Sequence, residues 1–295
     1  MTLLDGKQLS ATIKDEIAER VRHRAAAGHR APHLAAVLVG ENPASQVYVR
    51  NKVRSCERVG FDSTLIRLAA GTTETELLDQ VRTLNDDPAI DGFIVQLPLP
   101  DHIDEHRVTL AIDPAKDVDG FHPINFGLMA QGLPCFLPAT PYGIVQLLER
   151  YGIETSGKHA VVVGRSNIVG TPMSILLSRK SKTGNCTVTL THSRTQDLAA
   201  EVRRADIVVA AIGIPNFITA DMVKEGAVVI DVGINRVDDA SAKRGYRLVG
   251  DVDFATVAPR CSHITPVPGG VGPMTVTSLL LNTLQACEQR EKGND

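Results

Sequence analysis

The sequence predicts an α/β protein made of two domains, the second of which is a doubly wound parallel sheet. Its 295 residues reach the length at which a single hydrophobic core stops growing and chains divide into domains. Short apolar runs alternate with amphipathic stretches along most of the chain, a pattern typical of βαβ units and a parallel sheet. A glycine-containing turn also joins an apolar run to a helix in the second half. These three observations define the expected fold class.

The first half contains apolar runs that we expect to be buried strands, separated by amphipathic helices. Strands are expected in 33–40, 63–69 and 90–100. Helices are expected in 10–25, in a stretch ending near Gly60, and in 73–87, whose first turn is acidic. The segment 101–140 is richer in Pro, Gly and Asp and has few periodic stretches.

A helix in 140–152 leads into a second alternating series, with Pro141 near its start and Gly152 just past its end. Each later segment is expected to be a short strand or helix of the doubly wound type. The expected strands are 159–164, 186–192, 206–213, 227–234 and 247–254, and the expected helices are 171–178, 195–205 and 273–290.

Composition and charge exclude several classes of function. The net charge is −3, with both signs interspersed and no basic stripe, which argues against a nucleic-acid partner. No apolar run approaches the length needed to span a bilayer, and the N-terminal stretch does not resemble a signal peptide. Five scattered cysteines without a C-x-x-C motif indicate reduced thiols in the cytoplasm and predict no metal site.

Tyr48 and Lys52 are four residues apart in an amphipathic stretch, so they are expected on one face of a helix. They form either a reactive pair or a ring and a charged stem that cover apolar surface. A Tyr-x-x-x-Lys pair also occurs in short-chain dehydrogenases, where it follows the glycine-rich turn within one domain. Here the pair precedes that turn by more than 100 residues, which argues against such an enzyme. We expect it to meet a nucleotide across a cleft between domains.

The stretch "VVVGRSNIVGTPMSILL" predicts a nucleotide-binding turn. Gly164 follows an apolar run and Gly170 precedes an apolar helix. Glycine at a strand-to-helix turn lets the backbone approach a pyrophosphate, and the helix N-terminus supplies N–H groups and a positive dipole end. The pattern departs from G-x-G-x-x-G, because Ser166 stands at the place of the second glycine. An ordinary glycine-containing turn is the alternative.

The next strand favours NADP over NAD as the cofactor. An NAD site would place an acidic residue near the end of that strand to bind the ribose 2′-hydroxyl. The strand instead ends in Thr191, His192, Ser193 and Arg194, and Arg165 lies in the first turn. Arginine and hydroxyl donors suit a 2′-phosphate, although Arg194 is equally consistent with a solvated loop charge.

Six motifs follow one another along the chain: YVRNK, LNDDPAIDGFIVQLPLP, KDVDGFHPINFG, ATPYGIVQLLERYG, GRSNIVGTPM and PVPGGVGPMT. In this order and register they resemble the bifunctional methylenetetrahydrofolate dehydrogenase/methenyltetrahydrofolate cyclohydrolase family. The resemblance covers essentially the whole chain. One departure is visible, because Ala139 stands where the family usually has Cys in its P-C-T-P segment. That position is not among the residues to which we assign chemistry.

The resemblance implies two reactions and a set of catalytic residues. The first transfers a hydride from the bridging methylene of the folate to NADP, and the second adds water to the methenyl cation. Lys52 matches the catalytic lysine of the family and Gln96 its glutamine partner, which orients the amine without stabilising its charge. Tyr48 matches the tyrosine that lies against the folate rings. Asp119 matches the acid that binds the pterin, and without the resemblance it reads as a turn-capping residue.

The resemblance also assigns residues that line the bound molecules. Pro268, Gly269 and Gly270 belong to a loop that borders the folate; a plain connecting turn is the alternative. Ile234 matches a position that lines the nicotinamide pocket, and Gly164, Arg165, Ser166 and Ser193 are the other expected cofactor-binding residues. Asp117 is expected to be a turn residue, and His122 and His192 to be structural, since neither has a partner at metal-binding spacing.

The expected protein is a cytoplasmic homodimer with two α/β domains. Residues 1–138 and 270–295 are assigned to a substrate domain, and residues 139–269 to a Rossmann-type NADP-binding domain. The substrates implied are one-carbon derivatives of tetrahydrofolate. Two alternatives stay open: a monofunctional dehydrogenase of the same fold, and a catalytically silent folate- or nucleotide-binding protein.

Overall fold

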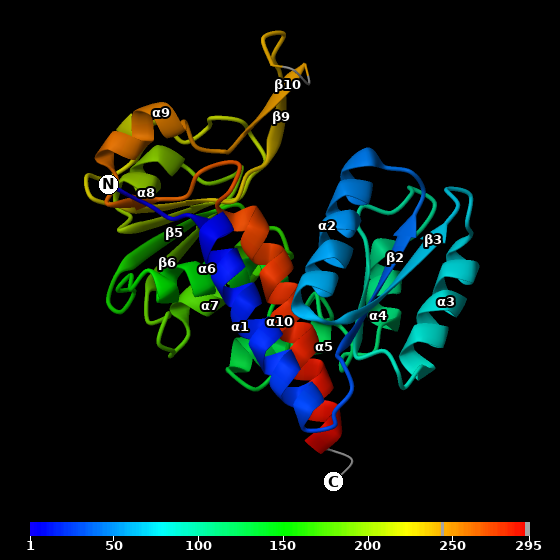
Figure 1. Cartoon of the computed structure of the whole chain (residues 1–295). Coiled ribbons are helices and arrows are strands. Elements are labelled where there is room, and N and C mark those ends of the chain that lie inside the picture. Colours follow the sequence, from blue (N-terminus) through cyan, green and yellow to red (C-terminus); the bar gives the residue numbers. More distant parts are fainter. Residues whose placement is uncertain (243–244, 293–295) are drawn as a thin grey trace. The chain divides into compact units, whose positions relative to one another are not determined.

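A computed structural model describes residues 1–242 and 245–292. The chain divides into two compact units, each with its own sheet (Figure 1). The three-stranded unit comprises Ala11–Ala139 and the chain from Val276 on, and the six-stranded unit comprises Met1–Ser10 and Thr140–Thr275. This arrangement confirms the predicted α/β fold class with two domains.

The three-stranded unit is built on a parallel sheet with the order β3-β2-β4. Its strands are β2 (His33–Val39), β3 (Asp62–Leu68) and β4 (Gly92–Val95). Its helices are α2 (Pro43–Val59), α3 (Glu74–Asp86), α4 (Glu105–Ala111) and α5 (Pro123–Gln131), together with most of α1 (Gly6–Ala26) and α10 (Val271–Lys292). The strands lie in the three predicted runs, whereas α4 and α5 occupy the segment in which the sequence shows few periodic stretches.

The core of this unit follows from the hydrophobic pattern of the sequence. Leu77, Val81 and Leu84 recur at helical spacing on α3 and pack on one face of the sheet with side chains of β2, β4 and α4. Thr73 caps the helix: its hydroxyl accepts the N–H of Glu76, and the Glu76 carboxylate accepts the N–H of Thr73. The acidic first turn therefore marks the start of α3, as the sequence predicts.

The six-stranded unit contains a parallel sheet with the order β1-β11-β8-β7-β5-β6. The strands are β1 (Thr2–Leu3), β5 (His159–Val163), β6 (Thr187–Thr191), β7 (Ile207–Ala210), β8 (Val228–Asp231) and β11 (His263–Ile264). The helical elements are α6 (Ala139–Arg150), α7 (Gly170–Ser178), α8 (Leu198–Arg203), η1 (Ala220–Met222), α9 (Phe254–Val257) and η2 (Ala258–Arg260). In Figure 1, α8 and α9 lie on one side of this sheet and α6 and α7 on the other.

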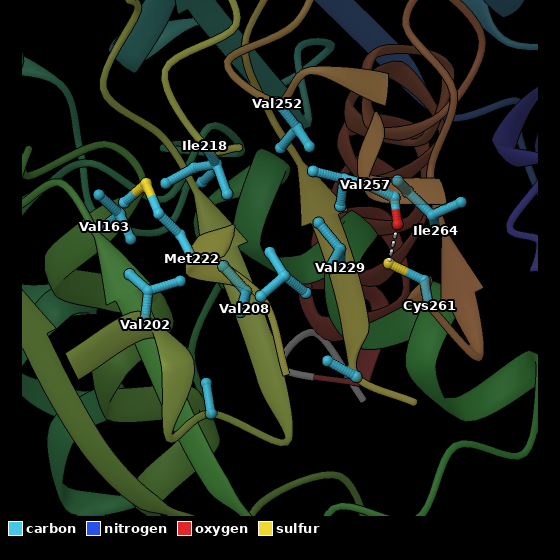
Figure 2. Close-up of a cluster of buried hydrophobic side chains, with 14 of the residues drawn as sticks. Val163, Val202, Val208, Ile218, Met222, Val229, Val252, Val257, Cys261 and Ile264 are labelled. Carbon is cyan, nitrogen blue, oxygen red and sulfur yellow. Dashed lines mark hydrogen bonds between the residues drawn. The ribbon is translucent and has the colours of Figure 1, made fainter. Parts of the chain in front are cut away.

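Side chains of β5, β7, β8 and β11 form a core with α8, η1 and α9 (Figure 2). Val163, Val208 and Val229 are fully buried in it. The Cys261 thiol donates to the Val257 carbonyl oxygen at 3.3 Å, and burial raises its pKa to about 11. This thiol therefore packs as a small apolar side chain.

One predicted strand of this unit differs from the structure. The segment 247–254 does not join the parallel sheet; its residues to Val249 form β10 (Tyr246–Val249), which pairs antiparallel with β9 (Asn235–Asp238) in a separate ribbon. Residues 1–10, which the sequence analysis places with the substrate domain, group with the six-stranded unit because β1 pairs with β11. The limits of the functional domains stay predictions: 1–138 with 270–295 for the substrate domain, and 139–269 for the NADP-binding domain. Residues 293–295 lie outside the described part of the chain.

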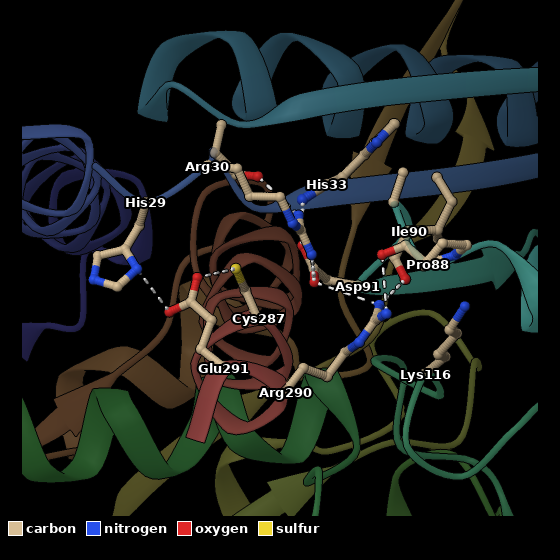
Figure 3. Close-up of polar contacts among 12 residues, drawn as sticks. His29, Arg30, His33, Pro88, Ile90, Asp91, Lys116, Cys287, Arg290 and Glu291 are labelled. Carbon is tan, nitrogen blue, oxygen red and sulfur yellow. Dashed lines mark hydrogen bonds and ion pairs between the residues drawn. The ribbon is translucent and has the colours of Figure 1, made fainter. Parts of the chain in front are cut away.

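A polar network fixes the last helix to the three-stranded unit (Figure 3). Asp91, just before β4, is fully buried and accepts two hydrogen bonds from Arg30, at 2.8 and 2.5 Å. Arg290 of α10 lies 3.7 Å from the same carboxylate and donates to the carbonyl oxygens of Pro88 and Ile90. The network lies at the amino end of β4, which leaves the carboxyl end of that strand to the candidate site.

Candidate active site

Lys52 and Gln96 meet at the carboxyl ends of strands β2 and β4. Lys52 lies on α2, is only 8% exposed, and its Nζ donates to Gln96 Oε1 at 3.2 Å. Gln96 directly follows β4, and its backbone N–H donates to the Val37 carbonyl oxygen in β2. Its Nε2 donates to the Leu97 carbonyl oxygen at 2.7 Å. With the amide nitrogen held in this way, the amide oxygen faces the lysine.

The topology explains why these residues lie together. The chain leaves the central strand β2 toward β3 on one side and later adds β4 on the other. Ligands of open α/β sheets bind outside the carboxyl ends of the strands at such a change of direction. Lys52, on the helix that follows β2, and Gln96, at the end of β4, both lie at this place.

The surroundings of Lys52 favour the neutral amine. Burial lowers the pKa of Lys52 from its ordinary value, and the negative charge of Asp119 acts in the opposite direction. Cys56, one turn further along α2, would act as Asp119 does, but burial raises the pKa of its thiol to about 12. Cys56 is therefore uncharged near neutral pH, and Lys52 is suited to exchange a proton.

Tyr48 and Asp119 have polar groups that are available to a ligand. Tyr48 lies one turn before Lys52 on α2 and is 41% exposed. Asp119 is half-buried, and its backbone carbonyl oxygen accepts the N–H of Ala139 at 3.2 Å. Within the described residues, neither the Tyr48 hydroxyl nor the Asp119 carboxylate has a hydrogen-bond partner. The four residues predicted for the chemistry thus belong to one unit.

Asp117 and His122 have structural roles, as the sequence analysis expects. The buried Asp117 carboxylate accepts the N–H groups of Phe121 and His122 and the side-chain amide of Asn125. Burial raises its pKa to about 6. The His122 ring accepts the N–H of Ile124 and caps α5. Both side chains are occupied in shaping the turn after Asp119.

The glycine-containing turn lies at the corresponding place in the six-stranded unit. β5 lies between β6 and β7, so the chain changes direction there as well. Gly164 has a φ of +113°, and a Cβ on it would lie 2.2 Å from the Ala211 carbonyl oxygen. A Cβ on Gly170 would lie 1.9 Å from the Gly164 carbonyl oxygen. The turn therefore requires glycine at both ends, and this bare backbone fits the close approach of a pyrophosphate.

The sequence analysis expects the backbone N–H groups at the start of α7 to face a pyrophosphate, but the structure shows them bonded within the turn. The Ser166 hydroxyl accepts the N–H of Val169 at 3.2 Å and that of Gly170 at 3.5 Å, and the Ser166 carbonyl oxygen accepts the N–H of Thr171. Pro172 has no N–H. The first N–H groups of the helix are thus used inside the turn, which leaves the positive end of the helix dipole and the exposed residues 165–168 to face a phosphate.

The remaining predicted cofactor residues lie on segments that follow neighbouring strands. Ser193 and Arg194 are exposed after β6, in a turn in which the His192 ring accepts the N–H of Arg194. The His192 backbone N–H donates to the Thr195 hydroxyl, so His192 shapes this turn. Ile234 follows β8 and is 44% exposed.

Residues 268–270 lie in the six-stranded unit, between β11 and α10. Gly269 has a φ of +112°, and its carbonyl oxygen accepts the N–H of Lys7 at 2.9 Å. A Cβ on Gly6 would lie 1.8 Å from the Gly270 carbonyl oxygen. Gly6 therefore lets the start of α1 pack against this loop, in which Gly269 adopts a conformation that favours glycine and Pro268 is exposed.

Two family descriptions match the chain. Residues 4–119 match the catalytic domain of tetrahydrofolate dehydrogenase/cyclohydrolase, and residues 138–291 match the NAD(P)-binding domain of the same enzymes. The chain belongs to the tetrahydrofolate dehydrogenase/cyclohydrolase family. The predicted resemblance is thereby confirmed, and the six-stranded unit contains most of the family's NAD(P)-binding domain.

Similar proteins and solved structures support this membership along the whole chain. The chain is 61% identical to the bifunctional protein FolD of Flavobacterium johnsoniae over 294 residues, covering 100% of both chains. The FolD dehydrogenase/cyclohydrolase structure of Campylobacter jejuni has a TM-score of 0.92 and 48% identity, covering 98% of this chain and 99% of that one. The Trypanosoma brucei FolD structure, complexed with NADP cofactor and inhibitor, has a TM-score of 0.93 and 39% identity, covering 99% and 98%.

Sequence reasoning passed over several polar residues that shape this family member. Asn282 is buried on α10, and Asp231 and Asp251 are buried in the six-stranded unit. A signal exists for Asn282, because it interrupts the apolar run "SLLLNTL".

In the described residues no group of three or more His, Cys, Asp or Glu could hold a metal ion. No helix among them combines the length and apolar character needed to cross a membrane.

Proposed function

We propose that the chain oxidises 5,10-methylenetetrahydrofolate with NADP and then hydrolyses the methenyl product to 10-formyltetrahydrofolate. The observation that carries this proposal is the buried contact of Lys52 with a neutral amide, Gln96. Membership of the family supports it, as do the relatives named bifunctional FolD and the relative complexed with NADP.

The second reaction requires proton transfer as water adds to the methenyl carbon. Lys52 is the group for this step, because burial lowers its pKa toward the range in which an amine accepts a proton. The cationic substrate would disfavour the ammonium further. Gln96 orients the amine with a hydrogen bond and adds no negative charge that would keep it protonated.

The other residues of the three-stranded unit bind the folate. The exposed ring of Tyr48 provides a flat surface for the fused rings of the substrate and positions them. The free carboxylate of Asp119 is suited to accept two N–H donors from an aminopyrimidinone edge. From the six-stranded unit, we also assign Pro268, Gly269 and Gly270 to folate binding.

The six-stranded unit binds NADP, which accepts the hydride of the first reaction when bound. The turn of Gly164 and Gly170 receives the pyrophosphate. Arg165, Ser166 and Ser193 are exposed at the carboxyl ends of β5 and β6, where cationic and hydroxyl donors suit a 2′-phosphate. Ile234 lines the place of the nicotinamide. We also infer that the enzyme is a cytoplasmic homodimer; a single monomeric species in light scattering would contradict this.

Two assays on the purified protein test the proposal. The first follows folate-dependent reduction of NADP, and the second follows hydrolysis of methenyltetrahydrofolate supplied directly. We expect both activities in the wild type. Lys52→Met should lower the rate of hydrolysis at least 100-fold, because general acid–base groups contribute about 10²–10⁴-fold.

Lys14→Met is the matched control, because Lys14 is a second, half-buried lysine of this unit whose pKa burial lowers. It should hydrolyse at nearly the wild-type rate. Full hydrolysis by Lys52→Met would show that Lys52 is not the base. A wild type that reduces NADP without hydrolysis would be a monofunctional dehydrogenase, and one without either activity would be a binding protein.

A further inference from the structure

Two aspartates of the six-stranded unit are buried side by side in sequence-distant segments. Asp231 is the last residue of β8 and is 3% exposed, and Asp251 is 0% exposed. Among the residues that the structure describes, neither carboxylate has an ion-pair partner. A buried carboxylate is unfavourable unless its oxygens accept hydrogen bonds. The groups that donate to this carboxylate pair therefore reveal what the pair holds in place.

Asp251 binds the segments that follow two neighbouring strands. Its Oδ2 accepts the backbone N–H groups of Ile212 at 2.7 Å and Gly213 at 2.9 Å, just after β7. Its Oδ1 accepts the side-chain amide of Asn235 at 2.9 Å, shortly after β8. One carboxylate thus joins the two segments at the carboxyl edge of the sheet.

Asp231 holds the backbone from which Asp251 projects. Its Oδ1 accepts the N–H groups of Gly233 at 3.0 Å and Asp251 at 2.9 Å, and its Oδ2 accepts that of Val252 at 3.0 Å. Charged hydrogen bonds of this kind are stronger than neutral ones. The two aspartates therefore act in series, the first fixing the second.

The surrounding backbone leaves no room for a different arrangement. A Cβ on Gly233 would lie 2.2 Å from Asp251 Oδ1, and a Cβ on Gly250 would lie 1.8 Å from Asp231 Oδ2. Real Cβ atoms do not approach so closely, so the backbone rests directly on the carboxylates. The segments are held by contact as well as by hydrogen bonds.

The segments held by the pair adjoin the cofactor turn. Gly164 packs against the Ala211 carbonyl oxygen, directly before the N–H groups that Asp251 binds. Ile234 lies between Gly233, which Asp231 binds, and Asn235, which Asp251 binds. The carboxylate pair therefore lies beneath the edge at which an open α/β sheet receives its nucleotide.

We propose that Asp231 and Asp251 are positioning residues for NADP. They hold residues 212–213 and 233–235 in the conformation that receives the nicotinamide half of the cofactor, and they do not touch the reacting atoms. This inference rests on the proposed NADP-dependent oxidation. Because hydrolysis of the methenyl substrate uses no NADP, the two reactions report separately on this role.

Asp251→Asn is the principal test, because it keeps the shape of the side chain and replaces an acceptor of two N–H groups with an amide. We expect the KM for NADP to rise at least tenfold in the dehydrogenase assay, with at least a tenfold weaker affinity for NADPH in calorimetric titration. The rate of methenyl hydrolysis should stay within twofold of the wild type. Asn235→Ala removes a single tether and is the milder second variant, with an expected rise of about threefold in the KM for NADP.

Asp206→Asn is the matched control. Asp206 also accepts a backbone N–H in this unit, that of His159, but at the amino ends of β5 and β7, so the KM for NADP should stay within twofold. An unchanged KM for NADP in Asp251→Asn and Asn235→Ala would overturn the inference. So would an equal loss of both reactions in Asn235→Ala, which indicates general damage. A wild type without NADP reduction would instead overturn the proposed function, and the inference with it.

Discussion

At the scale of single residues, the protonation of Lys52 depends on the neutral amide beside it. Its hydrogen-bond partner is the amide of Gln96, at 3.2 Å. Burial lowers the pKa of the amine, and the only described carboxylate acting on it is that of Asp119. A closer negative charge would reverse this balance, because an opposite charge at hydrogen-bond distance favours the protonated lysine.

Gln96→Glu should therefore slow hydrolysis at pH 7 by raising the pKa of Lys52. An ammonium cannot accept the proton, so the acidic limb of kcat/KM should move to higher pH, by about 1–3 units. The pH profile of methenyl hydrolysis measures this shift in the free enzyme. Gln96→Met removes the hydrogen bond without adding charge, so the maximum of kcat/KM should fall while the acidic limb does not move to higher pH. An acidic limb at the same pH in both variants would contradict the assigned partnership.

At the scale of elements, the long helix α10 holds the loop that carries Asp119. Asn282 is buried on this helix, and its side-chain amide donates to the carbonyl oxygens of Val118 at 2.8 Å and Leu137 at 2.9 Å. Asp119 directly follows Val118, and its own carbonyl oxygen accepts the N–H of Ala139. An amide with two N–H donors can serve both carbonyl oxygens at once.

Asn282→Leu should lower the free energy of unfolding by about 2 kcal/mol, because the Val118 carbonyl oxygen, in a buried contact, and the partly buried Leu137 carbonyl oxygen lose their donor. It should also raise the KM for the folate more than that for NADP. Urea denaturation and steady-state kinetics measure these effects. Thr283→Val is the control, since among the described residues the Thr283 hydroxyl bonds to the Leu279 carbonyl oxygen of its own helix alone. An equal effect of the two substitutions on folate binding would refute the role of Asn282.

At the scale of the whole molecule, each compact unit has its own sheet, and the candidate residues lie at the carboxyl ends of its strands. In the three-stranded unit, the opposite strand ends are used for stability. Asp91 joins Arg30, before β2, to Arg290 near the end of the chain (Figure 3). This division is expected, because polar groups placed for binding are seldom placed best for stability.

Asp91→Asn should lower the free energy of unfolding by about 3 kcal/mol, which is the lower limit of the range for breaking a buried ion pair. The lower limit applies because the Arg30 side chain is 43% exposed and keeps part of its hydration. Urea denaturation with a probe of the three-stranded unit measures the change. Asp15→Asn removes an exposed pair with Arg58 and should cost less than about 1 kcal/mol. A loss of that small size for Asp91→Asn would contradict the structural role of the network.

Much of the fold could be predicted because burial is encoded locally. The apolar runs that became β2, β4, β5 and β7 and the acidic start of α3 carry their own periodicity and end signals. Lys52 could be singled out for the same reason, since its spacing from Tyr48 places both on one helical face. Gln96, in contrast, stands between two apolar residues, so the local pattern predicts only that its side chain faces the opposite side of the strand from theirs. The family resemblance alone identified it as the partner of Lys52.

The tertiary structure decided what depends on residues far apart in the chain. β1 and β11 are too short to be recognised by period and exist because their backbones pair. Three further features also depend on which groups meet in the folded chain. They are the antiparallel pairing of β10 with β9, the hydrogen bonds of Ser166 inside its turn, and the hydrogen bond between Asp231 and Asp251. By itself the sequence determined which residues must leave water, because periodicity is a property of neighbours. Which polar groups meet once they are buried is a property of the folded chain alone.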